Sequence, residues 1–315
     1  MIRDKKNVFL FSGQGSQYYN MTRQLYENDE VFRNSMKELN QKFSEKLHKD
    51  IISELYCSDD RKYKMFDNTL YTHPCIFMCE ISIVKALHYK GVLPDVVIGT
   101  SLGEVGAAVV AGMISEDEGV EIVLNQTLAV NDNCKNGTLL AIVCDPKYFY
   151  ENEIFNNVEM ASVNNNEHFV VSGEISEINK ISNYLKQEGI LGVPIPVIHA
   201  FHSRLIDNGR EQYLNNTKAI KLKRPKIPFL SCSSGKFETP LTTEFFWNAI
   251  RKTIQFKKTI EFIYQICEFN FIDVGPGGTL AGFIRRILPY PNNLNVFFIE
   301  SPLKKADSIL SNIDI

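Results

Sequence analysis

The sequence lacks an excess of charge of either sign. Its 315 residues carry 34 Lys and Arg against 37 Asp and Glu, which gives a formal net charge of −3. The broad basic field that attracts nucleic acids or anionic membranes is therefore absent. The N-terminal apolar run spans only Val8–Phe11, too short for a signal peptide, and no stretch is typical of a transmembrane segment. We expect no nucleic-acid partner, no membrane partner and a cytoplasmic protein.

Regularly spaced cysteine pairs are also missing. The seven cysteines are an odd number at irregular spacing, which argues against a disulfide framework and favours a reducing compartment. Cys75 and Cys79 lie four residues apart in an apolar, helical stretch. Two buried thiols explain that spacing better than a metal pair does. We predict no metal site.

Nucleotide-binding motifs are absent too. The glycine-rich stretch "FSGQGSQ" (11–17) matches neither G-x-x-x-x-G-K-[ST] nor G-x-G-x-x-G. A glycine turn after a strand can still offer backbone N–H groups to a phosphate or to an oxyanion. The stretch "DVGPGG" (273–278) is best interpreted as a plain tight turn.

Short apolar runs that alternate with helical stretches make up most of the chain. Residues 7–11 and 95–99 are typical of buried strands, and helices are predicted over 75–90 and about 102–112. Residues 271–287 repeat the order of strand, glycine turn and helix. Continuous apolar strands followed by helices predict an α/β fold, with a mostly parallel sheet covered on both faces.

The pattern changes over 138–198. Strand-like and helical segments there predict a small two-layer α+β insert in a larger domain formed by 1–137 plus 199–315. The polar tail from about residue 303 is expected to be peripheral. Within the insert, the expected strands are 138–143, 158–164, 168–173 and 192–198, and the expected helical segments are 146–156 and 174–188.

The stretch "GTSLG" (99–103) places Ser101 between an expected strand and an expected helix. This is the G-x-S-x-G nucleophile elbow, in which glycines flank the serine because the sharp turn leaves no room for side chains. The N–H of Leu102, at the start of the helix, can stabilise an oxyanion. The motif alone is common, but its strand–turn–helix context favours a nucleophile.

A nucleophilic serine needs a base, and six histidines are available. His48 and His88 lie in polar helix-end contexts and are expected to be solvated. His168 follows a run of asparagines and is interpreted as a surface-loop residue. His199 and His202 lie where a strand ends and a helix begins, a suitable place for a base. The residues alone do not decide between these two.

Four stretches in this order resemble the malonyl-CoA:acyl-carrier-protein transacylase family, which includes polyketide synthase acyltransferase domains. They are "FSGQGSQ", "GTSLGE", "HAFHS" and "VGPG", and they span about residues 8–300. The resemblance implies an α/β-hydrolase-like large domain with an inserted ferredoxin-like domain. The sequence looks most similar to the acyl hydrolases of polyketide synthases that lack built-in acyltransferases.

The resemblance also implies roles for residues. Ser101 matches the serine that is acylated from a thioester, and His202 matches its base. The backbone N–H groups of Gln14 and Leu102 would form the oxyanion hole. A main-chain carbonyl, instead of an acid, would orient the histidine, and we place that carbonyl at Ala249.

Other positions match residues that line the family's substrate site, and several of them depart from its pattern. Asn164 matches an asparagine near the histidine, and Phe201 gives H-A-F-H, which accompanies malonyl selectivity. Thr100 stands where the family usually has histidine, and Ser12 where it has proline. His73 replaces the glutamine of a T-Q-P-A motif.

The most informative departure is Gln126, where malonyl-transferring members carry an arginine. That arginine pairs with the malonyl carboxylate. No arginine lies between Arg61 and Arg204, so no neighbouring register supplies one. A buried carboxylate without a counter-charge costs about 3–5 kcal/mol, or roughly 10²–10³-fold in transfer. Gln126 therefore predicts uncharged acyl groups, unless it is merely a tolerant helix position.

Three functions remain open. The first is hydrolysis of short acyl thioesters on acyl carrier protein, as proofreading of stalled polyketide synthase modules. The second is an acyltransferase that loads malonyl or a neutral acyl group from CoA. The third is a non-catalytic docking protein, which the intact Ser101 and His202 disfavour. We expect a monomer without a cofactor, and an acidic carrier protein as partner. The basic residues of 221–226 and Arg251–Lys252 are candidate contacts for that partner, although a merely solvated face explains them better.

Overall fold

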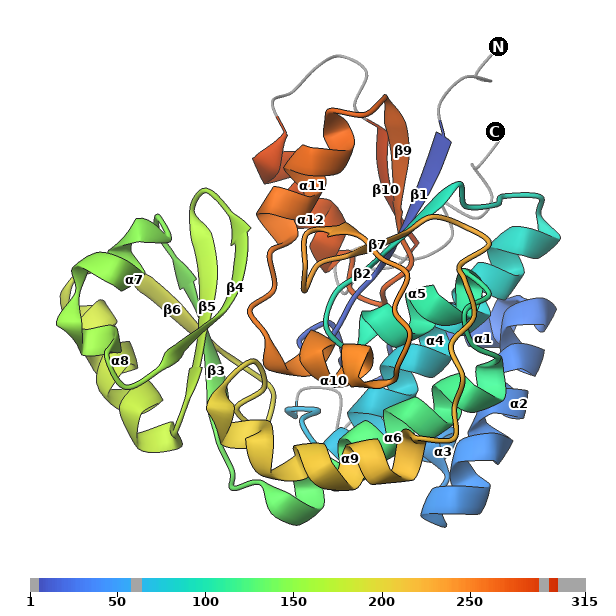
Figure 1. Ribbon diagram of the computed structural model, residues 1–315, viewed down its shortest axis with the longest axis horizontal. Helices are drawn as coiled ribbons and strands as arrows, with labels where there is room; N and C mark the ends of the chain where they lie inside the picture. Colours follow the sequence, from blue (N-terminus) through green and yellow to red (C-terminus); the bar gives the residue numbers. More distant parts are fainter. Residues whose placement is uncertain (1–5, 58–63, 289–294, 300–315) are drawn as a thin grey trace.

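Two β-sheets organise the structure (Figure 1). The computed structural model describes residues 6–57, 64–288 and 295–299; the predicted peripheral tail lies outside them. The larger sheet is parallel except for its last strand, β8, which is antiparallel to β7. In spatial order its strands are β10 (Asn295–Phe298), β9 (Phe269–Asp273), β1 (Lys6–Phe11), β2 (Val96–Gly99), β7 (Phe229–Ser231) and β8 (Lys236–Phe237).

Alternate side chains of β1 enter two separate cores, because successive residues of a strand point to opposite faces of the sheet. Val8 and Leu10 pack in one cluster with residues of α11 and α12. Phe9 and Phe11 belong to the other, larger cluster, to which α2, α4, α5 and α6 contribute. Both faces of the sheet are thus covered by helices, which explains why its strands are continuously apolar.

The helices of this larger part account for most of the chain. Before the small sheet these are α1 (Arg23–Asn28), α2 (Glu30–Leu47), α3 (Ile51–Leu55), α4 (Thr69–Tyr89), α5 (Gly103–Val110) and α6 (Glu116–Asn133). After it come η3 (Arg204–Gly209), α9 (Arg210–Thr217), α10 (Glu244–Arg251), α11 (Phe256–Tyr264) and α12 (Thr279–Ile287).

Helix α4 lies in the centre of this core. It begins six residues before the predicted start at residue 75, at Thr69, where Asn68 caps it by accepting from the N–H of Leu70. Pro74 lies inside the helix, and a proline usually marks a helix start because it lacks an N–H. Among the described residues, α4 alone has the length and composition to cross a membrane, but 83% of its apolar window is buried inside the fold, as in a core helix.

The second sheet is antiparallel, with strand order β4-β5-β3-β6 (Figure 1). Its elements follow one another as βαββαβ, with α7 and α8 on the side away from the large sheet. This arrangement matches the predicted ferredoxin-like insert, whose bounds, 138–198, stay a prediction. The elements are β3 (Thr138–Val143), α7 (Lys147–Glu151), η2 (Glu153–Phe155), β4 (Glu159–Asn165), β5 (His168–Gly173), α8 (Ile175–Gln187) and β6 (Leu191–Ile195).

The two sheets meet at the carboxyl ends of β1 and β2. The loop after β1 and the turn after β2 both face β3, β4 and β6 across a cavity. An isolated bridge between Ser162 of β4 and Ile254, just before α11, joins the two parts beside it. In open parallel sheets this end of the strands is the usual place of a binding site.

Candidate active site

Ser101 lies at a tight turn between β2 and α5. Its φ of 54° is left-handed, a strained conformation for a residue other than glycine. The flanking glycines make the turn possible: a Cβ on Gly99 would lie 2.4 Å from Cα of Glu104, and one on Gly103 would lie 2.4 Å from the carbonyl oxygen of Phe11. The predicted nucleophile-elbow geometry is therefore present, with the serine side chain held out of the turn.

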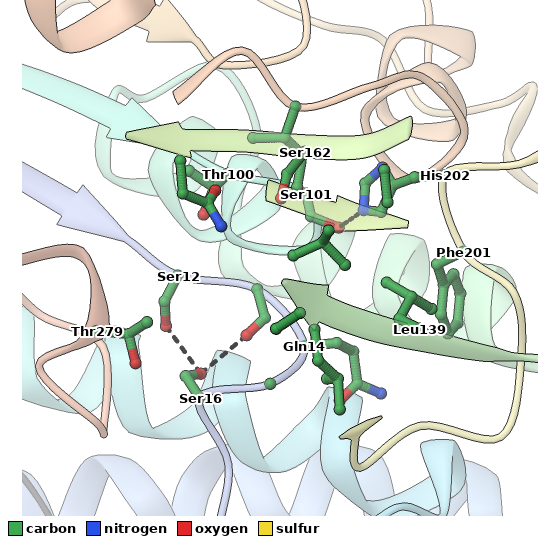
Figure 2. Close-up of a pocket in the computed structure, with 18 of the residues that line it drawn as sticks. Ser12, Gln14, Ser16, Thr100, Ser101, Leu139, Ser162, Phe201, His202 and Thr279 are labelled. Atoms are coloured by element: carbon green, nitrogen blue, oxygen red, sulfur yellow. Dashed lines mark hydrogen bonds between the residues drawn. The ribbon is translucent and has the colours of Figure 1, made fainter. Parts of the chain in front are cut away.

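The side chains of Ser101 and His202 are in contact (Figure 2). Ser101 Oγ lies 2.9 Å from His202 Nε2, and His202 Nδ1 lies 2.7 Å from the carbonyl oxygen of Lys252. Because a carbonyl only accepts, Nδ1 carries the proton, and Nε2 is left to accept from the serine. His202 also has a left-handed backbone, with φ of 62°, and its own N–H donates to the Ile250 carbonyl at 2.8 Å.

The orienting carbonyl belongs to Lys252, and the prediction of Ala249 is wrong. Ala249 lies within α10, where carbonyls point along the helix axis. Lys252 follows the helix end with φ −86° and ψ 158°, an extended conformation that turns its carbonyl out of the helix. The sequence predicts the presence of a helix here but not the residue at which it ends.

The pKa of His202 is lowered to about 4, mainly by burial; the bond to the Lys252 carbonyl raises it, and the positive charge of Arg251 lowers it. The imidazole is therefore neutral near pH 7. Its position beside Ser101 Oγ suits a group that takes a proton from the serine.

Two backbone N–H groups lie close to Ser101. Within the described ranges, neither the N–H of Gln14 nor that of Leu102 donates a hydrogen bond to the protein. Gly13 places the loop of Gln14 against the serine, since a Cβ there would lie 2.8 Å from Ser101 Cβ. The side chain of Gln14 donates instead to Thr72 Oγ1 at 2.9 Å. Both amides remain able to stabilise an oxyanion on an acylated serine.

A cavity of about 300 Å³ opens between the elbow and the second sheet. Its walls come from the loop after β1, from β3 to β6, and from the first residues of α11 and α12. Among the described residues that line it, none is Lys, Arg, Asp or Glu, and the only side chains that titrate in the usual pH range are His168 and His202. The cavity is thus mostly apolar and holds no fixed charge.

The structure places some of the predicted substrate-binding residues on the cavity wall and others behind it. Thr100, Asn164 and Phe201 line the cavity, together with Gln14. Thr100 Oγ1 donates to the Phe11 carbonyl at 2.9 Å, so this threonine ties the elbow to β1. The other two predicted residues, Gln126 and His73, are fully buried and do not line the cavity.

Within the ranges that the structure describes, each of the two residues behind the wall has one polar atom without a partner. Gln126 donates through Nε2 to the Phe246 carbonyl at 2.8 Å, and its Oε1 accepts nothing. His73 Nδ1 lies 3.1 Å from Thr127 Oγ1, and its Nε2 has no partner. Burial lowers the pKa of His73 to about 3, so this ring is neutral. Its centroid lies 5.3 Å from that of Phe201, which separates it from the cavity.

His168 is a site residue that the sequence analysis missed. It begins β5, lines the cavity and has a ring nitrogen 3.1 Å from Asn164 Nδ2. Its interpretation as a surface-loop residue is wrong, and burial lowers its pKa. The alternation of strand residues could have indicated this position. His168 lies two residues before Val170, which lines the same cavity, and strand residues two apart share a face.

The predicted basic contacts differ in their surroundings. Arg251 is already paired with Asp207 and Glu159. The basic residues of 221–226 are exposed, and this run lies beside the end of α5 opposite the elbow, since the N–H of its last residue donates to the Ala111 carbonyl at 2.8 Å. Their role as partner contacts stays a prediction. No group of three metal-ligating side chains occurs in the part of the chain that the structure describes.

Comparisons with known proteins agree with this geometry. The family model of the acyl transferase domain matches residues 8–295. The polyketide biosynthesis acyltransferase homolog BaeD of Bacillus velezensis is 37% identical over 308 residues, which cover 98% of this chain and 95% of BaeD. The homolog PksD of Bacillus subtilis is 38% identical, covering 90% of this chain and 87% of PksD.

Solved structures are similar over nearly the whole chain. An acyltransferase domain from the salinomycin polyketide synthase has a TM-score of 0.83 and 25% identity, covering 96% of this chain and 71% of that one. The malonyl CoA-acyl carrier protein transacylase of Clostridium perfringens has a TM-score of 0.77 and 26% identity, covering 94% and 93%. These matches confirm the predicted fold class and family: the chain belongs to the acyl transferase domain family.

Proposed function

We propose that the protein hydrolyses short, uncharged acyl thioesters carried by acyl carrier protein. Ser101 Oγ attacks the thioester carbonyl while its proton passes to His202 Nε2. The carbon–sulfur bond breaks, and the leaving thiolate takes that proton. Water then attacks the acyl-serine, gives its proton to Nε2, and releases the free acid as Ser101 Oγ recovers the proton. This chemistry needs no cofactor.

The observation that carries this proposal is the absence of a cation at the acyl site. Among the described residues, no Lys or Arg lines the cavity, and a neutral glutamine occupies the position of the family's arginine. Gln126 is held by the Phe246 carbonyl and can offer only an amide oxygen. A malonyl carboxylate would therefore be buried without a counter-charge, at a cost of about 3–5 kcal/mol.

The biological setting rests on the relatives. BaeD and PksD are named as acyltransferase homologs of polyketide biosynthesis, and both match this chain over most of their length. Carrier proteins of polyketide synthases are accordingly the proposed partners. Removing acyl groups from a stalled carrier would be a proofreading activity.

Transfer of an acyl group from CoA to the carrier is the second candidate. The family model and Phe201 of the H-A-F-H motif favour it. Ser101 and His202 would serve both reactions, because only the group that attacks the acyl-serine differs. The intact Ser101–His202 contact supports a catalytic role over a purely docking one.

The deciding experiment is intact-protein mass spectrometry of carrier protein loaded with acetyl or malonyl. We expect the protein to convert acetyl-carrier to the free thiol, to leave malonyl-carrier intact, and to lose its activity in Ser101→Ala. Movement of malonyl from CoA onto free carrier, with acetyl-carrier untouched, would instead establish a transacylase and refute the argument from Gln126.

A further inference from the structure

A buried carboxyl group lies beside the catalytic machinery without belonging to it. Glu80 is in the middle of α4 and only 1% exposed. Its Oε1 accepts from the N–H of Ser12 at 2.6 Å and lies 3.0 Å from Ser12 Oγ. Burying a carboxyl in an apolar core is unfavourable. Burial raises the pKa of Glu80, the bonds from Ser12 lower it, and the nearby Asp273 carboxyl raises it again.

Ser12 begins the loop that carries the N–H of Gln14. The hydroxyls of Ser12 and Ser16 lie 3.0 Å apart (Figure 2). Ser16 Oγ also donates to the Gly13 carbonyl at 2.9 Å. On its other side, Ser12 packs tightly against the turn after β9, where a Cβ on Gly275 would lie 2.3 Å from Ser12 Oγ. The short loop is thus bonded at both ends, with Gln14 between them.

The bonds to Glu80 depend on the residue at position 12: the hydroxyl bond requires the Ser12 side chain, and the backbone bond requires any residue other than proline. The family pattern has proline there, and proline has neither a backbone N–H nor a hydroxyl. In this chain the residue at that position makes both bonds to Glu80. The glutamate therefore holds the loop by contacts that the usual family residue cannot make.

We propose that Glu80 is a positioning residue, which acts through Ser12 to fix the N–H of Gln14 for oxyanion stabilisation. The role rests on the proposed acylation of Ser101, and it holds equally for hydrolysis and transfer. Misplacing a catalytic group by about 1 Å costs on the order of 10²-fold in rate, and removing one oxyanion donor costs about 10²–10³-fold. We expect loss of the Glu80–Ser12 bonds to slow acylation by about 10- to 100-fold.

The main test is Glu80→Leu in the full chain, with Glu80→Gln as the matched control. Leucine removes the acceptor without adding a charge, and it leaves the buried N–H of Ser12 without that partner, which lowers stability. Glutamine keeps an oxygen that can accept from Ser12, so it should retain most of the activity. Three quantities are measured: the acylation burst with p-nitrophenyl acetate, the affinity for an alkyl boronic acid that forms a tetrahedral adduct on Ser101, and the affinity for an unreactive thioether analogue of acyl-pantetheine.

We expect Glu80→Leu to lose acylation rate and boronic-acid affinity together, with thioether affinity unchanged and with a lowered Tm that still leaves the protein folded at the assay temperature. Acylation at the wild-type rate would overturn the proposal. An equal loss of affinity for the thioether and the boronic acid would also overturn it, because a role in general folding or binding would then suffice. If Glu80→Leu does not fold, Ser12→Ala, which removes one of the two bonds, must show a smaller decrease of the same selective kind, and no decrease refutes the role.

Failure of the proposed function gives a different result. A wild-type protein that shows the burst but does not release acid from acetyl-carrier contradicts hydrolysis alone. The comparison between Glu80→Leu and Glu80→Gln stays valid in that case, because it measures only the acylation step.

Discussion

Two groups of buried polar side chains near the cavity differ in how completely they are hydrogen-bonded. In the first, Ser101 Oγ, both ring nitrogens of His202 and the Lys252 carbonyl are all partnered. The second group is here called the Phe201 cluster. Its members are His73, His199, Gln126 and Trp247, which lie next to the Phe201 ring or contact residues beside it. Each member has one buried polar atom that finds no partner among the described residues: His73 Nε2, Gln126 Oε1, His199 Nδ1 and Trp247 Nε1.

The Phe201 cluster is connected by short contacts. The ring centroids of His73 and His199 lie 5.3 Å and 6.1 Å from that of Phe201. His73 is hydrogen-bonded to Thr127, the neighbour of Gln126. The side-chain amide of Gln126 donates to the carbonyl of Phe246, the residue before Trp247. Half of the eight unpartnered buried side-chain atoms in the described residues belong to this cluster, so they mark one region and are not scattered defects.

This difference in hydrogen bonding indicates different roles for the two groups, one in the reaction and one in substrate selection. A fully bonded pair is held in its reactive geometry before substrate arrives, which favours catalysis. Unpartnered buried donors and acceptors each cost about 1–3 kcal/mol until a ligand group or water satisfies them. We interpret the Ser101–His202 pair as the fixed chemistry, and we expect the Phe201 cluster, which lies behind the cavity wall formed by Phe201, to influence which acyl group fits.

The largest effect is expected from a substitution in the Ser101–His202 pair. Ser101→Ala removes the nucleophile and should lower acylation by about 10⁴- to 10⁶-fold, the range found when members of such catalytic units are deleted. Stopped-flow measurement of the p-nitrophenolate burst checks this, with Tm as the control for folding. A burst of wild-type amplitude would show that another residue is acylated.

The next effect alters the Phe201 cluster. Gln126→Arg adds a buried cation, which should destabilise the unliganded protein by about 3–5 kcal/mol and raise the malonyl-to-acetyl selectivity by roughly 10²–10³-fold. Gln126→Met, neutral and of similar length, is the matched control. Carrier-protein mass spectrometry gives the selectivity, and thermal unfolding with and without a malonyl-pantetheine thioether gives the stability. Unchanged selectivity in a folded Gln126→Arg would place the acyl group elsewhere.

The third prediction concerns how the acylation rate of the Ser101–His202 pair depends on pH. With the pKa of His202 lowered to about 4, acylation should stay constant from pH 7 to about pH 5 and fall to half near pH 4. A histidine of ordinary pKa would already be about tenfold less active at pH 5.5. The pre-steady-state rate measured against pH distinguishes the two, and a midpoint near 6.5 would contradict the effect of burial.

The same shift predicts how stability varies with pH. The pKa in the folded state lies below the unfolded value of 6.5, so the unfolded chain binds the proton first. His202 therefore contributes stability above about pH 6.5 that is lost as the pH falls toward 4. Comparing Tm against pH for the wild type and His202→Gln isolates this contribution, and parallel curves would refute it.

The sequence predicted the local features well and the long-range ones poorly. The strand 138–143 and the strand 168–173 have the predicted bounds, because Asn136 and Gly137 precede the first and Glu167 and Glu174 flank the second. The elbow at Ser101 follows from glycine sterics, which are also local. Lys252 was missed because its carbonyl reaches His202 across 50 residues of chain, and its direction depends on where α10 ends.

The smallest expected effect concerns the ring that separates the cavity from the Phe201 cluster. Phe201→Leu shortens this side chain while keeping it apolar, and it should favour butyryl over acetyl by about tenfold, the effect of one or two methylenes in an apolar pocket. The gain should appear in KM, because Ser101 and His202 are untouched. Steady-state hydrolysis of acetyl- and butyryl-pantetheine measures it, with Leu139 on the cavity wall, changed to Val, as the control for general loosening. If both variants shift the preference equally, Phe201 is an ordinary wall residue. Its ring would then not be what links the cavity to the Phe201 cluster.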